Sequence, residues 1–207
     1  MDTIFSLPKD IYKNRRLVAK LAKNDFKTRY AGSYLGIVWA FIQPVITILV
    51  YWFVFSVGFR SGTGDLGVPF VLYLVAGIVP WFFFQDALIG GTNSLLEYNY
   101  LVKKVVFNIS VLPVVKIISA MFVHAFFVLF TIILYAAYGK LPDLYYLQII
   151  YYSGCVFLLV LGLSYATSAI VIFFRDLTQI INIVLQVGVW LTPIMWIVEN
   201  TKQKCYL

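Results

Sequence analysis

Five long stretches of this sequence contain no Lys, Arg, Asp or Glu. They cover residues 30–59, 66–85, 117–139, 144–174 and 177–198. Each reaches the roughly 20 residues that a helix rising about 1.5 Å per residue needs to cross the hydrocarbon core of a bilayer. With 62% hydrophobic and only 12% charged residues, the chain lacks the polar surface of a soluble domain. We therefore predict an all-α, polytopic membrane protein with about five transmembrane helices, and exclude an ordinary soluble enzyme or a disordered or disulfide-stapled secreted chain.

The apolar pattern divides the chain into three parts. Residues 1–36 form an N-terminal segment, residues 37–199 a transmembrane domain, and residues 200–207 a short polar tail. Within the domain we place the spans at 37–59, 68–89, 111–138, 144–174 and 177–197. The spans form one membrane domain, because we detect no internal repeat.

The distribution of basic residues predicts the orientation. Residues 1–36 hold eight of the sixteen Lys and Arg residues, and with this segment inside, Lys103, Lys104, Lys116 and Arg175 also lie on the inner side. Twelve basic residues inside and four outside satisfy the positive-inside rule. The net charge of +7 thus indicates anionic membrane lipid rather than nucleic acid. We expect a multi-pass protein of the cytoplasmic (inner) membrane with its N-terminus in the cytoplasm.

Residues 11–29 have the pattern of an amphipathic helix. Apolar side chains recur near helical spacing, while Arg15, Arg16 and Lys20 lie largely between them. Such a helix lies in the headgroup layer with its basic stems along the apolar surface. The alternative is a plain basic segment that only sets topology.

The sequence offers little for catalysis. His124 is the only histidine, and Ser119 is its nearest hydroxyl in sequence. A nucleophile needs a base within hydrogen-bond reach, and a lone histidine in a span more often packs and bonds to a neighbouring helix. Scattered carboxylates and two separated cysteines give no metal spacing, so we expect no metal and no bound cofactor.

Asp86 is the strongest candidate for a functional charge within a span, since charge in lipid is costly. It is either a proton-relay group or, as we favour, the partner of a basic residue or backbone donor near the inner boundary. Aromatic side chains make up 18% of the chain, and rings along a path can stack on sugar faces or simply pack helices. Together with Asp86, the candidate substrate-path residues are Tyr51, Trp52, Phe55, Trp81, Phe82 and Phe83.

The chain lacks the Gly-x-x-x-x-Gly-Lys-Ser/Thr loop that cradles nucleotide phosphates. Nucleotide energy would therefore come from another polypeptide docking on the inner side, at the N-terminal helix and the segment 91–110. The candidate docking residues are Arg15, Arg16, Lys20, Glu97, Tyr100, Lys103 and Lys104.

Three segments resemble ABC type-2 transporter permeases that export polysaccharides. They are NDFKTRYAGSYLGIVWAFIQP at 24–44, SLLEYNYLVKKVVFNISVLP at 94–113, and FFRDLTQIINIVLQVGVWLTPIMW at 173–196. The resemblance is closer to the O-antigen, capsule and teichoic-acid exporters than to the drug-export branch. The matching positions include Lys27, Arg29, Tyr30, Ser33, Gly36, Trp39, Pro44, Arg175, Asp176 and Pro193.

This resemblance implies a transporter subunit rather than an enzyme. It implies a permease homodimer that binds two copies of an ABC ATPase, which alone holds ATP and Mg²⁺. In that family the ATPase contacts correspond to residues 11–28 and 95–107 here. The implied cargo is a lipid-linked polysaccharide such as O-antigen, capsule or teichoic acid; the alternatives are a smaller lipid or drug, or an inactive membrane scaffold.

The sequence departs from the family pattern at its end. Family members normally continue through an outer re-entrant segment to a sixth span, whereas this sequence ends in the polar tail 200–207. We expect a truncated or frameshifted member.

Overall fold

The computed structural model describes residues 14–58, 68–98, 109–140 and 143–195. Every regular element in these ranges is helical, which confirms the all-α prediction. The α-helices are α2 (Arg15–Arg29), α3 (Trp39–Trp52), α4 (Phe70–Glu97), α6 (Leu112–Ala137), α7 (Leu147–Val171) and α8 (Leu177–Leu191). Short 3-10 turns η1 (Gly36–Val38), η4 (Ile109–Val111) and η5 (Leu144–Tyr146) lead into α3, α6 and α7, and a π-helical stretch η2 (Phe53–Gly58) continues α3.

Four continuous helical segments are long and apolar enough to cross a membrane, namely Gly36–Gly58, Phe70–Glu97, Ile109–Ala137 and Leu144–Val171. They fall close to the first four predicted spans. The fifth is shorter than predicted, because α8 ends at Leu191 rather than near residue 197. Pro193 disfavours helical backbone at Thr192, which is extended with φ −75° and ψ 140°. The predicted tail 200–207 lies outside the described residues.

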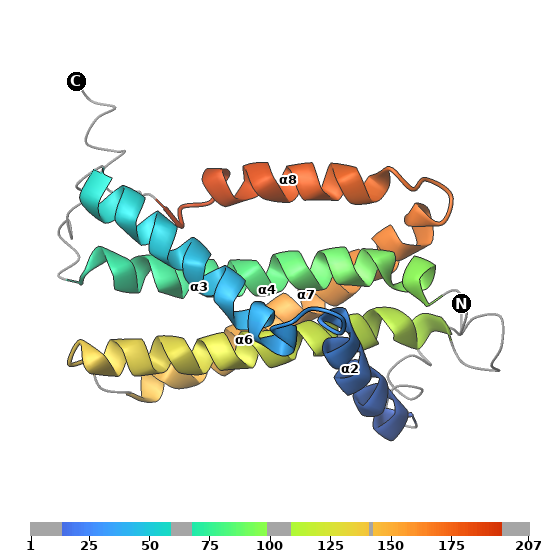
Figure 1. Ribbon diagram of the computed structural model, residues 1–207, viewed down its shortest axis with the longest axis horizontal. Helices are drawn as coiled ribbons and strands as arrows, with labels where there is room; N and C mark the ends of the chain where they lie inside the picture. The colour runs from blue at the N-terminus through green and yellow to red at the C-terminus, as the bar shows by residue number, and fades with distance from the viewer. Residues whose placement is uncertain (1–13, 59–67, 99–108, 141–142, 196–207) are drawn as a thin grey trace.

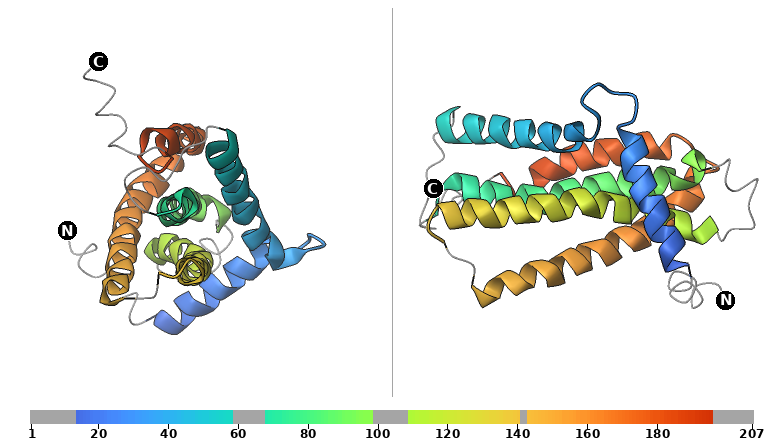
Figure 2. Two further views of the ribbon diagram at one scale, coloured as in Figure 1. Left: turned by 90° about the vertical axis from the view of Figure 1, so that its left-hand side faces the viewer. Right: turned by 60° about the horizontal axis from the view of Figure 1, so that its bottom comes forward.

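Helices α4 and α6 form the centre of the bundle. Seen end-on in Figure 2, they are surrounded by α7, α8, α3 and α2, and Figure 1 shows α4, α6, α7 and α8 running along the long axis. The central pair carries most of the fully buried side chains, such as Leu72, Ile78 and Ile117. The surrounding helices instead expose large apolar side chains, including Ile46, Leu158 and Leu191. A bundle with a closely packed centre and an apolar exterior is suited to lipid.

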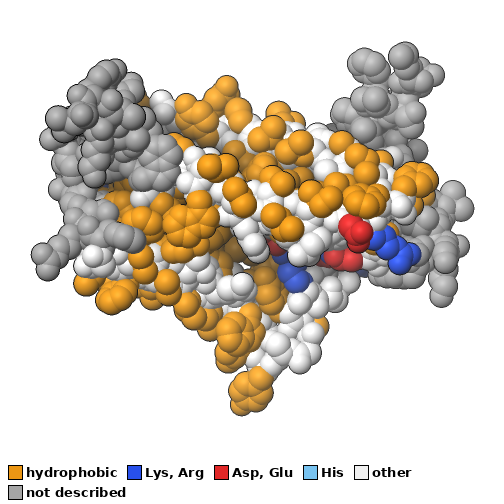
Figure 3. Space-filling view, turned by 90° about the horizontal axis from the view of Figure 1, so that it is seen from above, with side chains coloured by type: hydrophobic (Ala, Val, Ile, Leu, Met, Phe, Trp, Pro, Cys, Tyr) orange, Lys and Arg blue, Asp and Glu red, His pale blue; other side chains and the backbone are white. Residues whose placement is uncertain are grey.

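One face of the described bundle has few charges. Figure 3 shows one face of the molecule covered mainly by hydrophobic side chains, with the charged side chains gathered toward one end. The face between α3 and α8 is therefore apolar over most of its length, as a surface in contact with hydrocarbon must be.

Small residues bring α4 and α7 close together. A Cβ placed on Gly91 of α4 would lie 2.2 Å from Ser164 Oγ and 2.6 Å from Ser164 Cβ of α7. Beside this contact, the hydroxyls of Thr92 and Thr167 lie 2.7 Å apart and form a hydrogen bond between the same two helices. Close backbone approach and hydroxyl pairing are the usual means of joining helices in lipid.

Helix α2 lies across the end of the bundle rather than along it (Figures 1 and 2). It buries Val18 and Ala22 against Val111, Val114 and Val115 at the start of α6. The Nζ of Lys116, also on α6, lies 2.6 Å from Asp25 Oδ1, and the two residues are only 6% and 5% exposed. Lys116, which the charge count places on the inner side, is thus buried, and its ammonium group holds α2.

We expect Gly91→Ala to destabilise the bundle, because the added methyl group overlaps Ser164. Overpacking of a closed helix contact costs about 1–3 kcal/mol. The thermal unfolding midpoint of the chain in detergent micelles measures this effect. Gly162→Ala on α7 is the matched control, since nothing lies within 4 Å of its added Cβ. The double variant Gly91→Ala/Ser164→Gly should recover most of the loss; a Gly91→Ala midpoint equal to that of the parent would contradict the close approach.

We expect Lys116→Met to loosen α2, because it leaves the buried Asp25 carboxylate without its closest cation. Removing one partner of a buried ion pair costs about 3–5 kcal/mol. Limited proteolysis after exposed α2 residues, together with the unfolding midpoint, reports the change. Lys23→Met, on the exposed side of α2, is the control. Asp25→Asn/Lys116→Met should be less damaging than Lys116→Met alone, and equal damage would show that the pair does not hold the helix.

Candidate functional site

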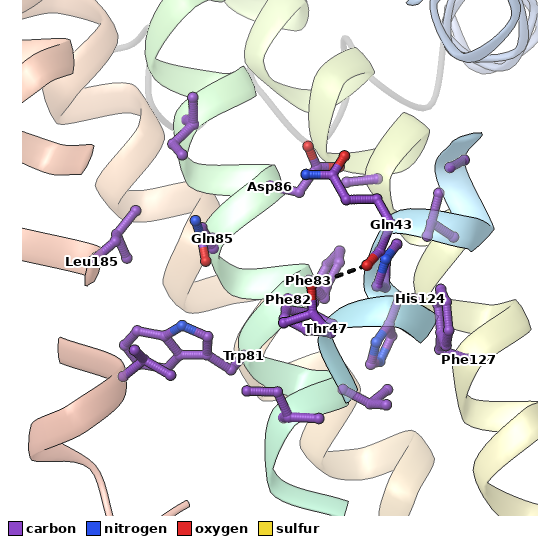
Figure 4. A pocket seen from close by; sticks show the side chains of 18 of the residues that line it. Gln43, Thr47, Trp81, Phe82, Phe83, Gln85, Asp86, His124, Phe127 and Leu185 are labelled. Atoms are coloured by element: carbon purple, nitrogen blue, oxygen red, sulfur yellow. Dashed lines mark hydrogen bonds between the residues drawn. The ribbon is translucent and has the colours of Figure 1, made fainter. Parts of the chain in front are cut away.

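A cavity of about 570 Å³ lies within the membrane-spanning bundle, between α3 and α8 in front of α4 and α6. Ligand pockets in proteins typically occupy about 300–1,000 Å³. Figure 4 shows that polar and aromatic side chains from separate helices converge on it, with Gln43 and Thr47 from α3 and Trp81, Gln85 and Asp86 from α4. Gln43 and Trp190, which line the cavity, are exposed, so the cavity opens to the surroundings of a single chain.

Five of the seven candidate path residues line this cavity. They are Tyr51, Trp81, Phe82, Phe83 and Asp86. Phe83 is only 3% exposed and stacks on His124 at 4.6 Å between ring centroids, so it contributes to packing as well as to the wall.

The other two candidate path residues, Trp52 and Phe55, do not line the cavity. Trp52 is 39% exposed on the outside of α3, while Phe55 packs on Phe70 with ring centroids 5.8 Å apart. The difference follows from helix geometry, because residues one position apart point about 100° away from each other. Tyr51 therefore faces α8, where its ring meets Trp190 edge-on at 6.3 Å, and Trp52 does not.

The uncharged polar residues of the cavity were missed by sequence reasoning, which followed charges and aromatic rings. Gln43 and Thr47 are four positions apart in α3 and hence share one face, and Gln186 approaches from α8. Thr47 Oγ1 donates a hydrogen bond to the backbone carbonyl of Gln43 at 3.0 Å. An amide and a hydroxyl at helical spacing within an otherwise apolar span were the available signal.

Pro44 also shapes the cavity. It lies inside α3 and has no N–H to donate to the carbonyl of Ala40, one turn earlier. Both Ala40 and Pro44 line the cavity. The freed carbonyl and the π-helical stretch η2 at the other end make α3 the least regular of the cavity's helices, and such irregularity in lipid is tolerated where a helix borders a cavity.

At the α2 end, the cavity reaches an ion pair between α2 and α4. Arg29 Nη1 donates to both carboxylate oxygens of Asp86, at 2.8 Å and 2.7 Å. This confirms that Asp86 pairs with a basic residue. Burial alone would lower the pKa of Arg29, but Asp86 beside it more than compensates and raises it, so the guanidinium stays charged.

A second hollow, of about 370 Å³, lies beside this pair and is lined by the remaining charges of the cluster. Lys116 pairs with both Asp25 and Glu97, and Tyr98 donates its hydroxyl to Asp25 Oδ1 at 2.7 Å. Burial would raise the pKa of Asp25, but the hydrogen bonds from Lys116 and Tyr98 hold it below its ordinary value. The Asp25 carboxylate is therefore ionised at neutral pH, and its contribution to docking α2 is lost only in strong acid.

The candidate docking residues differ in their surroundings. Arg15, Arg16 and Lys20 are exposed on α2. Glu97 ends α4 and is 52% exposed, although its carboxylate pairs with Lys116. Tyr100, Lys103 and Lys104 lie outside the described residues.

The positions that carry the family resemblance gather mainly around the link between α2 and α3. Tyr30 contacts Phe26 edge-on at 6.1 Å, Ser33 Oγ accepts from the N–H of Gly36 at 3.0 Å, and Gly36 itself has φ +53°. Among the rest, Tyr30, Trp39 and Pro44 line the cavity, Lys27, Arg175 and Asp176 are exposed, and the carbonyl of Pro193 accepts from Tyr73 Oη at 2.6 Å. In the described part of the chain, no ion pair joins Arg175 to Asp176.

His124 joins two helices. Its Nε2 lies 3.1 Å from Ser153 Oγ on α7. The contact fits the packing role expected for a lone histidine in a span. Among the described residues, no group of three or more His, Cys, Asp or Glu side chains is placed to hold a metal ion.

Comparison with known proteins agrees with this architecture. Residues 16–205 match the model of the ABC-2 type transporter family. The chain is 28% identical over 190 residues to the O-antigen export system permease protein RfbA of Myxococcus xanthus, covering 92% of this chain and 72% of that protein. An RfbA of Klebsiella pneumoniae is 27% identical over 196 residues, covering 91% of this chain and 71% of that protein. The family match spans α2, every apolar helix and the cavity between them, so this multi-pass membrane protein belongs to the ABC-2 type transporter family.

Proposed function

We propose that this chain is the permease subunit of an exporter that moves a lipid-linked polysaccharide across the cytoplasmic membrane, with its N-terminus in the cytoplasm. The main support is the cavity within the spanning helices, where amide, hydroxyl and aromatic groups converge. Sugars offer hydroxyls for the amides and flat apolar faces for the rings. The relatives named as O-antigen export permeases favour the same class of cargo.

We propose that the energy source is an ABC ATPase on a separate chain, which the family match supports. We propose that two copies of it bind, one to each permease of a homodimer, and that ATP and Mg²⁺ are held there. The exposed basic side of α2, with Arg15, Arg16 and Lys20, is the proposed contact, together with the segment after α4. Charges on an exposed helix face steer association and fix register more than they add raw affinity.

A second copy of the chain is the proposed cover of the cavity. The polar groups of Gln43 and Thr47 face an opening bordered by the exposed apolar side chains of α3 and α8, such as Ile46, Val187 and Trp190. Polar groups that face hydrocarbon are costly, whereas two such openings placed together form a shared path for a hydrated glycan. This arrangement supports the dimer.

We expect the chain to co-purify with an ABC ATPase from the source cell. Replacing Arg15, Arg16 and Lys20 together by Glu reverses their charge and should weaken that association at least about tenfold, the equivalent of ~1.4 kcal/mol. Quantitative immunoprecipitation from detergent extracts measures it. Lys140→Glu at the opposite end of the bundle is the control. An ATPase recovered equally well with the triple variant would exclude α2 as the contact, and no ATPase with the parent would argue against the transporter.

We expect Trp81→Ala to slow glycan export about fivefold, the effect of losing about 1 kcal/mol of aromatic stacking. Surface glycan per membrane-inserted permease is the measurement. Trp52→Ala is the matched control, because this ring does not line the cavity. Trp81→Phe should retain most activity. Equal export by the Trp81→Ala and Trp52→Ala variants would contradict the assignment of the path.

A further inference from the structure

Two hollows of the molecule share two lining residues. The cavity of about 570 Å³ between α3 and α8 and the hollow of about 370 Å³ under α2 are both lined by Asp86 and Ile89. Arg29, which lines only the hollow, holds Asp86 from that side. The barrier between the membrane-level cavity and the charged hollow is therefore little more than one ion pair with an aliphatic side chain beside it.

The surroundings of this ion pair allow it to separate and form again. Asp86 is 45% exposed and Arg29 22% exposed, so neither partner is fully enclosed by the protein. The Nη1 of Arg29 bonds to both oxygens of Asp86, which holds the carboxylate in one orientation. Partly exposed ion pairs are weaker than fully buried ones and can open and close.

The pair also joins elements with different attachments. Asp86 belongs to α4 in the centre of the bundle, whereas Arg29 is the last residue of α2. One turn earlier, Asp25 anchors α2 to Lys116 of α6, and earlier still Val18 and Ala22 pack against α6. The attachments of α2 to α6 thus remain intact when only the Arg29 contact is released.

The segment that links α2 to α3 contains two glycines with positive φ. Gly32 has φ +98° and Gly36 has φ +53°, which are conformations that other L-residues rarely adopt. A Cβ on either glycine would meet nothing within 4 Å, so open space surrounds this link. Positions that absorb a change in backbone angles between packed elements are where hinges form. The end of α2 and the start of α3 can therefore move separately.

We infer that the Arg29–Asp86 ion pair is the closure of the cavity on the α2 side, and that displacement of the end of α2 opens it. The closure is a property of this chain. The inference rests on the proposed function only for the role of an ATPase bound to α2, which would supply the displacement, and for the direction in which a cargo passes.

The test uses thiol accessibility and needs neither cargo nor ATPase. In the full chain, Cys155 and Cys205 are replaced by Ser, and Thr47→Cys places one thiol in the cavity. Two membrane-impermeant methanethiosulfonates, one with an ammonium group and one with a sulfonate, are applied to the α2 side of phosphatidylcholine vesicles. The rate of modification is compared with and without Asp86→Asn.

We expect Asp86→Asn to speed modification by both reagents at least about tenfold, the ratio that ~1.4 kcal/mol produces. A change of local charge alone would move the two rates in opposite directions, so acceleration of one reagent only would overturn the closure. The exchanged pair Arg29→Asp/Asp86→Arg should return both rates toward the parent value. Asp176→Asn, an exposed carboxylate outside the cluster, is the control and should change neither rate.

Two further outcomes bear on the inference. A thiol at position 47 that reacts as fast in the parent as in the Asp86→Asn variant would show that the cavity is already open, and would overturn it. Arg29→Gln, which removes the other partner, should accelerate both reagents as Asp86→Asn does, so the result does not depend on one variant. Either result leaves the cargo assignment untouched, because no glycan is present.

Discussion

A lysine ammonium group deprived of water must be surrounded by carboxylates, and Lys116 meets this requirement by drawing on two other helices. Asp25 comes from α2 and Glu97 from the end of α4, and Tyr98 completes the cluster with its ring 5.1 Å below the ammonium nitrogen. Since Asp25 is fixed to α6, α2 lies across the end of the bundle, and the next turn of the helix brings Arg29 to Asp86. The buried lysine therefore decides where the edge of the cavity lies.

The cavity lies between the closely packed central helices and two outer ones. Helices α4 and α6 pack through their aliphatic side chains, and α3 contains Pro44 and continues into a π-helical stretch. Helix α3 contributes amide and hydroxyl groups where it faces α8, and it presents apolar side chains outward. This division leaves a polar recess with an apolar border, which explains both how the chain is stable in lipid and why a polar cargo and a second copy of the chain are the proposed partners.

The spans were predictable from sequence because hydrocarbon imposes length and apolarity on every helix that crosses it. The pairing of Asp86 was predictable in kind, since a carboxylate at that depth needs a cation, but its partner Arg29 is 57 positions away and only the tertiary fold identifies it. The burial of Lys116 was not predictable, because its partners Asp25 and Glu97 lie on other helices and only the tertiary fold brings them together. Trp52 was indistinguishable from Tyr51 by composition, and only the direction of each side chain separates them.

The central claim is that the Lys116 cluster holds α2 in one position across the bundle. With Cys155 and Cys205 replaced, Lys23→Cys and Gln179→Cys place spin labels on the exposed sides of α2 and α8. Double electron–electron resonance then measures the distance between the two labels, in vesicles where labelled chain is diluted with unlabelled chain. The account predicts one narrow distance distribution that broadens when Lys116 is replaced by Met. A distribution that is already broad with Lys116 present, or one that the replacement leaves unchanged, would contradict it.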